Sequence, residues 1–559
     1  MILYALIFVP VVFALLIAAR PVRDARQLAL IGTLLPVGLV AWLLFSFDWD
    51  LAAQFQFPST IPWFTALGGI ERGDVALGGV QLSVGVDSVS LMLVALTVLL
   101  GPICVAGSFS AITERVKTYY AWLVALQGAM TAVFLARDLV LFYVAFEFTL
   151  VPMWVLISLW GSTNRRKAAT RFFLYTFTGS MIALAGLVYV VWTAAGIRGY
   201  WTFDIGDLSL FARLHLTASE QAWVMLALLA GFAVKVPLFP VHTWLPLAHT
   251  EAPTAGSVIL AGVLLKLGTY GIYRFVLPFC PIAAWEYAPT VAAVSIVGIV
   301  YAGLICWVQT DVKKLVAYSS VAHLGFCILG MFSFNTAGLT GSVLYMVNHG
   351  LSTGALFLMI GMVYERYHTR SMKELGGLAS RMPVWATFMV FFTLASVGLP
   401  GLNGFVSEFL CLMGAFQSNT GIVDGAGATS GRLGPWYAAI AGTGMIVAAM
   451  YLLLMVGHIV WGPLREPHGH AAHHEHGHDE GRANPPGAET HGSPLPRDLS
   501  WREIGILIPL AVACIALGVF PKPLLDGLKD PVNAIAAQVV GAGVKARTAG
   551  LPPAQEAAP

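Results

Sequence analysis

Long apolar stretches follow one another along most of this 559-residue chain, and short polar segments separate them. An α-helix needs about 20 predominantly apolar residues to cross the ~30 Å hydrocarbon core of a membrane. The pattern therefore predicts an all-α polytopic membrane protein. We expect about 14 transmembrane helices, at residues 2–19, 27–47, 86–110, 118–136, 138–160, 170–195, 220–245, 254–278, 288–309, 314–334, 338–364, 384–416, 435–461 and 503–520.

The distribution of Lys and Arg predicts how these helices are oriented. Most of the basic residues fall in loops that follow odd-numbered helices, such as the cluster at 165–167. The positive-inside rule places those loops in the cytoplasm and both termini on the periplasmic side of a bacterial inner membrane. The first helix has no basic residue before its apolar run, which favours an uncleaved helix over a signal peptide.

Composition agrees with a membrane protein and excludes several other classes. Hydrophobic residues make up 58% of the chain and charged residues 11%, whereas soluble proteins carry about 25% charged residues. The net charge of +2 gives no support for nucleic-acid binding. The six cysteines include no C-x-x-C pair, so neither an iron–sulfur cluster nor a structural zinc site is expected. No dinucleotide-binding glycine motif follows a strand pattern, so we expect no redox cofactor in this chain.

A histidine-rich segment near the C-terminus is the one low-complexity region. Histidine tracts can bind Zn²⁺ or Ni²⁺, but this one shows no fixed ligand spacing. A solvated cytoplasmic loop with incidental metal affinity is the simpler interpretation, and its role stays open. The histidines are His468, His470, His473, His474, His476, His478 and His491.

Three sequence landmarks recur in the two halves of the chain and indicate an internal repeat. The two members of each pair are five predicted helices apart. Because an odd number of membrane crossings separates the two copies, the second copy is inverted in the membrane relative to the first. Inverted repeats are common in transporters. The pairs are Asp138 and Asp311, Leu174-Tyr175 and Leu344-Tyr345, and Pro237 and Pro400.

The repeat divides the chain into five predicted parts. These are the N-terminal helices 1–3 (1–117), a first repeat of helices 4–8 (118–278), a second repeat of helices 9–13 (288–461), the histidine-rich loop (462–502), and helix 14 with a C-terminal tail (503–559).

Two predicted helices contain residues that break helical structure. Helix 7 contains Pro237 and Pro240, and helix 12 contains Pro400, Gly401 and Gly404. Proline removes a backbone donor and glycine permits unwinding. Because lipid cannot satisfy the freed carbonyl groups, such breaks should face protein or a wet cavity. Two breaks at matching places in the repeat favour a functional site over a simple kink.

Four charged residues lie deep within predicted spans: Glu147, Lys235, Lys266 and Glu408. Each costs at least about 2.5–3.5 kcal/mol at the bilayer centre unless it is paired or hydrated. The two lysines are too central in their helices to reach the membrane surface, which leaves structural ion pairing or an ion path.

Three histidines join this set, namely His242, His323 and His349. A lone helical histidine is often a hydrogen-bonded packing residue. All three lie between the two broken helices in chain order, however, and histidine exchanges protons near neutral pH. The set therefore favours protons as the transported species, and no acidic cluster suggests a Ca²⁺ or Mg²⁺ site.

Four segments carry a specific family resemblance: 142–152 (FYVAFEFTLVP), 232–275, 311–325 (DVKKLVAYSSVAHLG) and 398–409 (GLPGLNGFVSEF). Together they make the chain resemble subunit M of bacterial NADH–quinone oxidoreductase (respiratory complex I), the counterpart of mitochondrial NADH dehydrogenase subunit 4. The resemblance extends from about residue 80 to 460. Most paralogous subunits have lysine in helix 12, whereas Glu408 resembles subunit M.

The resemblance implies a fold of fourteen helices with two inverted five-helix repeats, and a proton path. It implies that Glu147 and Lys235 form a controlling pair, that Lys266 and His323 or His349 relay protons, and that Glu408 is the terminal exchange site.

The resemblance also implies partners. FMN, iron–sulfur clusters and quinone are expected in other subunits, and the antiporter-like subunits L and N and membrane lipids are expected as neighbours. The alternative function is a subunit of a multisubunit Na⁺/H⁺ antiporter. The order of proton steps, the quinone and any use of Na⁺ stay open.

Overall fold

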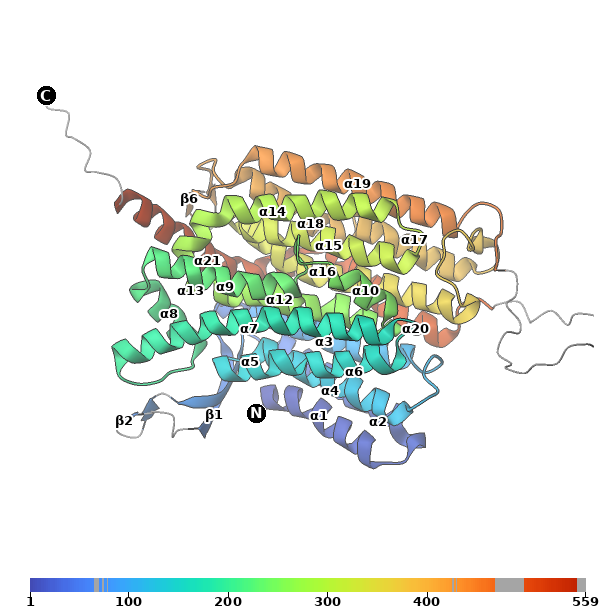
Figure 1. Ribbon diagram of the computed structural model, residues 1–559, viewed down its shortest axis with the longest axis horizontal. Helices are drawn as coiled ribbons and strands as arrows, with labels where there is room; N and C mark the ends of the chain where they lie inside the picture. Colours follow the sequence, from blue (N-terminus) through green and yellow to red (C-terminus); the bar gives the residue numbers. More distant parts are fainter. Residues whose placement is uncertain are drawn as a thin grey trace, which may run out of the picture.

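The computed structural model describes residues 1–64, 70–72, 75–77, 79–424, 427–428, 430–467 and 497–549. The seven histidines of the predicted loop lie outside these residues. Within them, long helices lie side by side with their axes roughly aligned (Figure 1).

The helices follow one another along almost the whole described chain. Their bounds are α1 Ile2–Ala19, α2 Ala25–Ser46, α3 Ser88–Gly107, α4 Val116–Leu135, α5 Leu139–Phe148, α6 Leu150–Trp160, α7 Arg165–Arg198, α8 Ile205–His215, α9 Ala218–Lys235, α10 Trp244–Glu251, α11 Thr254–Ile259, α12 Leu265–Gly271, α13 Leu277–Phe279, α14 Pro281–Trp307, α15 Val312–Met331, α16 Thr336–Tyr367, α17 Pro383–Val397, α18 Asn403–Gln417, α19 Pro435–Ile459, α20 Trp501–Val519 and α21 Lys522–Ala549. Short 3₁₀ turns are η1 Val22–Asp24, η2 Trp49–Leu51 and η5 Leu378–Ser380, and π-helical segments are η3 Leu260–Leu264 and η4 Ile272–Val276.

Twelve helical segments of the described chain are long and apolar enough to span a membrane. This confirms the predicted class of an all-α polytopic membrane protein. The two predicted spans missing from the twelve are helices 7 and 12, and the structure divides each of them into two pieces: α9 with α10, and α17 with α18. The total of fourteen stays a prediction.

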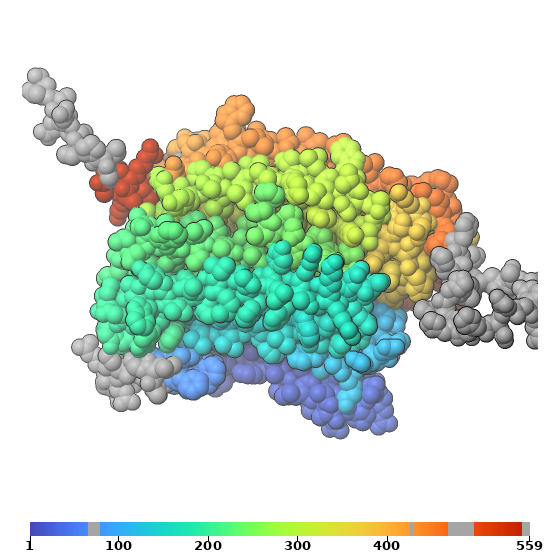
Figure 2. All heavy atoms as spheres, viewed as in Figure 1, coloured from blue at the N-terminus to red at the C-terminus, as the bar shows by residue number. Residues whose placement is uncertain are grey.

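Two central segments place the candidate site. The most apolar stretch of the continuous segment α11–α13 is completely buried, and so is that of helix α16. Helix α16 packs against α15 and α18. The outer helices shield them, and Figure 2 shows the chain crossing one face in order, from the N-terminal helices at the bottom to α19 at the top. Side chains on α12 and on residues 338–363 of α16 are therefore shielded from the surface.

Three features at one end of the bundle are absent from the sequence analysis. Strand β1 (Gln56–Phe64) pairs antiparallel with β4 (Val80–Val86), and helix α8 lies near them (Figure 1). The segment expected as a C-terminal tail instead forms the amphipathic helix α21, which packs against α14 and α16. The remaining strands are short: β2 Ile70–Arg72, β3 Val75–Leu77, β5 Val423–Asp424 and β6 Gly427–Ala428.

Some predicted helix ends are wrong because the helices continue beyond the apolar stretches that predicted them. Helix α14 begins at Pro281 rather than 288, since proline is tolerated in the first turn, where a missing N–H costs nothing. Helix α7 begins at Arg165 rather than 170, so the basic cluster assigned to a loop lies in its first turn.

The two aspartates that suggested the repeat cap their helices in the same way. Asp138 Oδ1 accepts hydrogen bonds from the backbone N–H groups of Val140 (2.8 Å) and Leu141 (3.2 Å). Asp311 Oδ1 accepts equivalent bonds from Lys313 (2.7 Å) and Lys314 (3.1 Å). An aspartate at this position satisfies backbone donors that have no partner inside the helix. The five-part division of the chain stays a prediction.

Candidate functional site

The first helix break separates α9 from α10. Helix α9 ends at Lys235, Pro237 and Pro240 lie in the interruption, and α10 begins at Trp244. The Trp244 indole Nε1 donates a hydrogen bond to the Val234 carbonyl (2.9 Å). A side chain thus satisfies a carbonyl at the break, as the low polarity of the surroundings requires.

The second break separates α17 from α18 and positions Glu408. Gly398 and Gly401 have positive φ angles of 82° and 92° beside Pro400. A Cβ on Gly398 would lie 2.6 Å from Glu408 Oε2, and a Cβ on Gly404 would lie 2.1 Å from the Ala395 carbonyl oxygen. Glycine at 398 therefore permits both the backbone turn and the close approach of the Glu408 carboxylate.

Glu147 and Lys235 lie near each other beside the first break. They interact electrostatically, although no direct ion pair joins them in the described chain. The Lys235 ammonium lies 4.2 Å from the centroid of the Phe146 ring, and Lys235 is 4% exposed. Both carboxylate oxygens of Glu147 are buried without a hydrogen-bond partner among the described residues. Each charge therefore stabilises the ionised form of the other without a direct ion pair between them.

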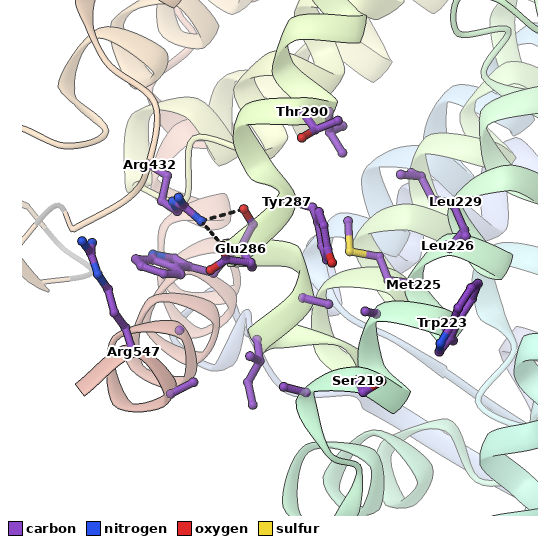
Figure 3. A pocket seen from close by; sticks show the side chains of 18 residues that line it. Ser219, Trp223, Met225, Leu226, Leu229, Glu286, Tyr287, Thr290, Arg432 and Arg547 are labelled. Atoms are coloured by element: carbon purple, nitrogen blue, oxygen red, sulfur yellow. Dashed lines mark hydrogen bonds and ion pairs between the residues drawn. The ribbon is translucent and has the colours of Figure 1, made fainter. Parts of the chain in front are cut away.

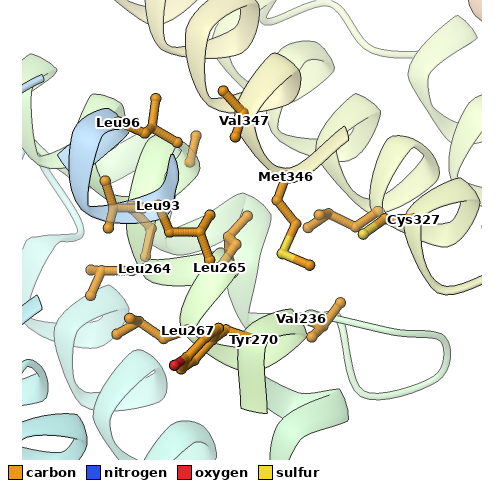
Figure 4. Packing of buried hydrophobic residues seen from close by; sticks show 14 of the residues in the cluster. Leu93, Leu96, Val236, Leu264, Leu265, Leu267, Tyr270, Cys327, Met346 and Val347 are labelled. Atoms are coloured by element: carbon orange, nitrogen blue, oxygen red, sulfur yellow. The ribbon is translucent and has the colours of Figure 1, made fainter. Parts of the chain in front are cut away.

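Lys266 lies at the centre of the bundle, fully buried, in the short helix α12 between the π-helical segments η3 and η4. Figure 4 shows apolar side chains of this segment and its neighbours, including Leu265, Leu267 and Met346. Its ammonium donates hydrogen bonds to the carbonyl of Ala261 and to His349 Nδ1, the latter at 2.7 Å. Segments of π-helix occur frequently at functional sites.

A second group of buried polar residues connects to the second break. His323 Nδ1 lies 2.6 Å from the Tyr345 hydroxyl, which donates a hydrogen bond of 2.6 Å to Glu408 Oε1. His323 Nδ1 also lies 3.3 Å from the same carboxylate oxygen. All three residues are at most 3% exposed. Tyr345 is not among the site residues predicted from the sequence, although Leu344-Tyr345 is one of the repeat landmarks.

The hydrogen bonds assign the ring tautomers of the two histidines. His349 Nδ1 accepts from Lys266, so the proton of a neutral His349 ring is on Nε2. The Tyr345 proton points to Glu408, so His323 donates from Nδ1, and its Nε2 is an open acceptor. Both Nε2 atoms are buried without a partner among the described residues, and the ring centroids are 5.9 Å apart. The two rings, whose planes are inclined by 65°, therefore offer a donor and an acceptor on the two sides of this gap.

His242 lies apart from this group. It is buried in the first break, where its ring packs against Phe239, Tyr301 and Tyr318. In the described chain no hydrogen bond joins it to Lys266 or to the residues that follow. The structure thus brings together Lys266, His349, His323 and Glu408, and places His242 with aromatic side chains.

Two further charged residues, Lys313 and Glu251, are buried at helix ends, whereas the four charges predicted to lie deep within the spans stay a prediction. Lys313 is 6% exposed and donates a 2.6 Å hydrogen bond to the Ala252 carbonyl. Glu251 is also 6% exposed and accepts from Ser162 (2.7 Å).

His249 on α10 was also missed. It is fully buried, its ring stacks on Phe357 at 4.6 Å, and neither ring nitrogen has a hydrogen-bond partner among the described residues. It interacts electrostatically with both Lys313 and Lys266. No sequence signal distinguished it from an ordinary packing residue other than its place beside the first break.

Buried ionisable side chains next to two broken helices define a class of polytopic membrane protein that moves ions through its interior. The chain belongs to the NADH:quinone oxidoreductase/Mrp antiporter transmembrane family, whose profile matches residues 136–434.

Curated relatives place the chain more narrowly within this family. It is 39% identical to NADH-quinone oxidoreductase subunit M of Rhodobacter capsulatus over 90% of this chain and 89% of the relative. It is 37% identical to NADH-ubiquinone oxidoreductase chain 4 of Marchantia polymorpha over 95% of this chain and 96% of that protein.

Solved structures share the fold. A chain of respiratory complex I from Thermus thermophilus matches 96% of this chain and 100% of its own length, with a TM-score of 0.78 and 27% identity. A chain of the Mrp complex from a Dietzia species matches 96% of this chain and 99% of its own length, with a TM-score of 0.75 and 23% identity. The second likeness concerns the fold alone.

Proposed function

We propose that this chain is a proton-translocating membrane-arm subunit of an NADH–quinone oxidoreductase. We place it in a bacterial plasma membrane with both termini periplasmic, and we expect antiporter-like subunits L and N as its neighbours. The relatives named as subunit M or chain 4, at 36–39% identity over most of the chain, support this function over that of an Na⁺/H⁺ antiporter subunit.

The observation that carries the proposal is the buried polar line from Lys266 to Glu408. It passes through His349, His323 and Tyr345, with one gap between the two imidazole rings. Burying ionisable residues at membrane depth costs free energy. If this line served only for packing, apolar side chains would pack better, so its presence favours a proton path.

Proton movement along this line keeps every group's bonding balanced. Lys266 gives a proton to His349 Nδ1 while the Nε2 proton of His349 passes, through a water in the gap, to His323 Nε2. His323 then releases its Nδ1 proton to the Tyr345 oxygen while Tyr345 passes its own proton to Glu408. Histidine suits this role because either ring nitrogen accepts or donates near neutral pH.

Glu147 and Lys235 act as the switch at the start of the line. While the Glu147 carboxylate is close, it stabilises the protonated form of Lys235. When Glu147 moves away or is neutralised, the buried ammonium loses its main stabilisation and releases a proton towards Lys266. Each charge moved against the membrane potential costs about 2.3 kcal/mol per 100 mV, which the loss of the electrostatic attraction between two buried charges can match.

His249 fits the uptake side of the same path. It interacts electrostatically both with Lys313, at the end of α15 predicted to be cytoplasmic, and with the central Lys266. Its two unpartnered ring nitrogens give it free donor and acceptor capacity. We assign it the transfer of protons from the cytoplasmic end of α10 to Lys266.

NADH oxidation and quinone reduction belong, on this proposal, to partner subunits that hold FMN, iron–sulfur clusters and quinone. The test is purification of the native assembly that contains this chain. Flavin and iron–sulfur absorbance together with NADH-driven acidification of reconstituted vesicles are expected. An assembly without these chromophores that exchanges Na⁺ for H⁺ would replace the proposal with the antiporter function.

A further inference from the structure

A groove of about 920 Å³ opens between α9, α14 and α21, away from the buried line (Figure 3). This volume lies within the ~300–1,000 Å³ of typical ligand pockets. Its apolar lining includes Leu226 and Leu229 of α9 and Val291 of α14, while Arg432 and Arg547 lie on the opposite side. The groove is therefore amphipathic, with an apolar wall and a basic one.

The groove lies at the level of a membrane surface. Its residues come from the N-terminal parts of α9 (218–229) and α14 (282–291), from Arg432 just before α19, and from α21. Trp223 and Tyr287 line it and are 70% and 47% exposed. Trp and Tyr are enriched where a membrane protein passes from headgroups to hydrocarbon. The charge bias predicts that this is the periplasmic surface.

The charges at the groove are not fully paired within the protein. Arg432 forms an ion pair with Glu286 (2.7 Å) and lies over the Trp285 ring (5.1 Å), so this pair leaves little net charge. Arg547 is exposed, lines the groove, and has no ion pair or hydrogen bond in the described part of the chain. One unpaired positive charge thus lies at the mouth of an apolar groove.

From these features we propose that the groove binds one anionic glycerophospholipid of the surrounding leaflet. Its phosphate contacts Arg547, and an acyl chain lies along Leu226, Leu229 and Val291. Arginine is well suited to phosphate because its planar guanidinium can donate two parallel hydrogen bonds. The lipid joins α21 to the membrane helices at the turn where Gly543 packs tightly on Trp285.

The test counts phospholipid retained by the purified assembly after exchange into a defined mixture of phosphatidylglycerol and phosphatidylcholine. Thr290 is exposed and lines the groove, so Thr290→Trp fills it; the control is Val297→Trp, an exposed position of α14 outside the groove. We expect one fewer retained phospholipid per chain in Thr290→Trp and no loss in Val297→Trp. Equal retention in the parent protein and Thr290→Trp would overturn the proposal.

A variant and a matched control on α21 test the proposed contact between Arg547 and the lipid headgroup. Arg547→Ala should lower the preference for phosphatidylglycerol about fivefold, since a basic residue near anionic lipid contributes about 1 kcal/mol. Lys545→Ala, an exposed neighbour that does not line the groove, should leave the preference unchanged. An equal loss in both variants, or no preference in the parent protein, would overturn the role of Arg547.

A second measurement tests the lipid directly, without a substitution that fills the groove. A photoreactive phenylalanine analogue at position 223 should cross-link to a phospholipid in native membranes. Cross-linking to another protein subunit alone would mean that a protein covers the groove, and the lipid proposal would be wrong.

Discussion

The Tyr345 hydroxyl connects His323 to Glu408, and Tyr345→Phe removes this connection while it keeps the ring. In the present structure the hydroxyl makes two contacts of 2.6 Å, one with His323 Nδ1 and one with a carboxylate oxygen. Phenylalanine fills the same buried space, so α16 and α18 should pack as before. The variant therefore tests proton transfer with little change in assembly.

The expected loss follows from the hydrogen bond to the carboxylate. A hydrogen bond to a charged group is worth about 1.5–3 kcal/mol, which corresponds to a factor of about 10 to 150 in rate. His323 Nδ1 stays 3.3 Å from the same carboxylate oxygen and offers a poorer direct route. The lower end of the range applies, and we expect about a tenfold slower NADH-driven proton translocation.

The assay is the initial rate of acidification in vesicles that contain the reconstituted assembly. Tyr119→Phe is the control, because Tyr119 on α4 is fully buried and its hydroxyl forms a hydrogen bond of 2.9 Å with Ser108, the C-cap residue of α3, away from the line. It should lose similar stability but translocate normally. An undiminished rate in Tyr345→Phe, or an equal decrease in Tyr119→Phe, would refute the assignment of Tyr345 to the path.

Three further predictions concern other parts of the path and its orientation. A single cysteine in place of Arg166 should resist a membrane-impermeant thiol reagent in intact cells and react in inverted vesicles; labelling from outside would reverse the predicted orientation. Glu147→Ala and Lys235→Ala should each abolish most coupled activity without loss of assembly, and the double variant should be little worse than either, whereas losses that multiply would mean two independent sites. His249→Phe keeps the stacking on Phe357 but removes both ring nitrogens, and it should slow translocation about tenfold or more, since proton-transfer groups contribute ~10²–10⁴-fold; a normal rate would leave His249 as a packing residue.

The sequence is sufficient to predict the spans and breaks because both depend on local physics. Apolar length sets each span, and Pro and Gly set the interruptions near Pro237 and Pro400. Charges at membrane depth also stand out against an apolar background, which is why Lys266 and Glu408 could be found without a structure.

What the sequence did not predict depends on contacts between distant segments. Tyr345 is an ordinary residue of an apolar helix until His323 and Glu408 are placed beside it. Lys313 follows an N-cap and looks solvated, yet the Ala252 carbonyl and the loop around it bury the side chain. Helix α21 has low hydrophobicity, and its stability comes from packing on α14 and α16.

The most direct test of the proton path is the number of protons translocated per NADH oxidised by an assembly with Glu408→Gln. Glutamine keeps the size of the side chain and can accept the Tyr345 hydrogen bond, but it cannot exchange a proton. The proposed path predicts a correctly assembled enzyme with a clearly lower proton yield per NADH. An unchanged yield at full turnover would show that Glu408 is a structural partner of Tyr345 and that the buried line does not carry the protons.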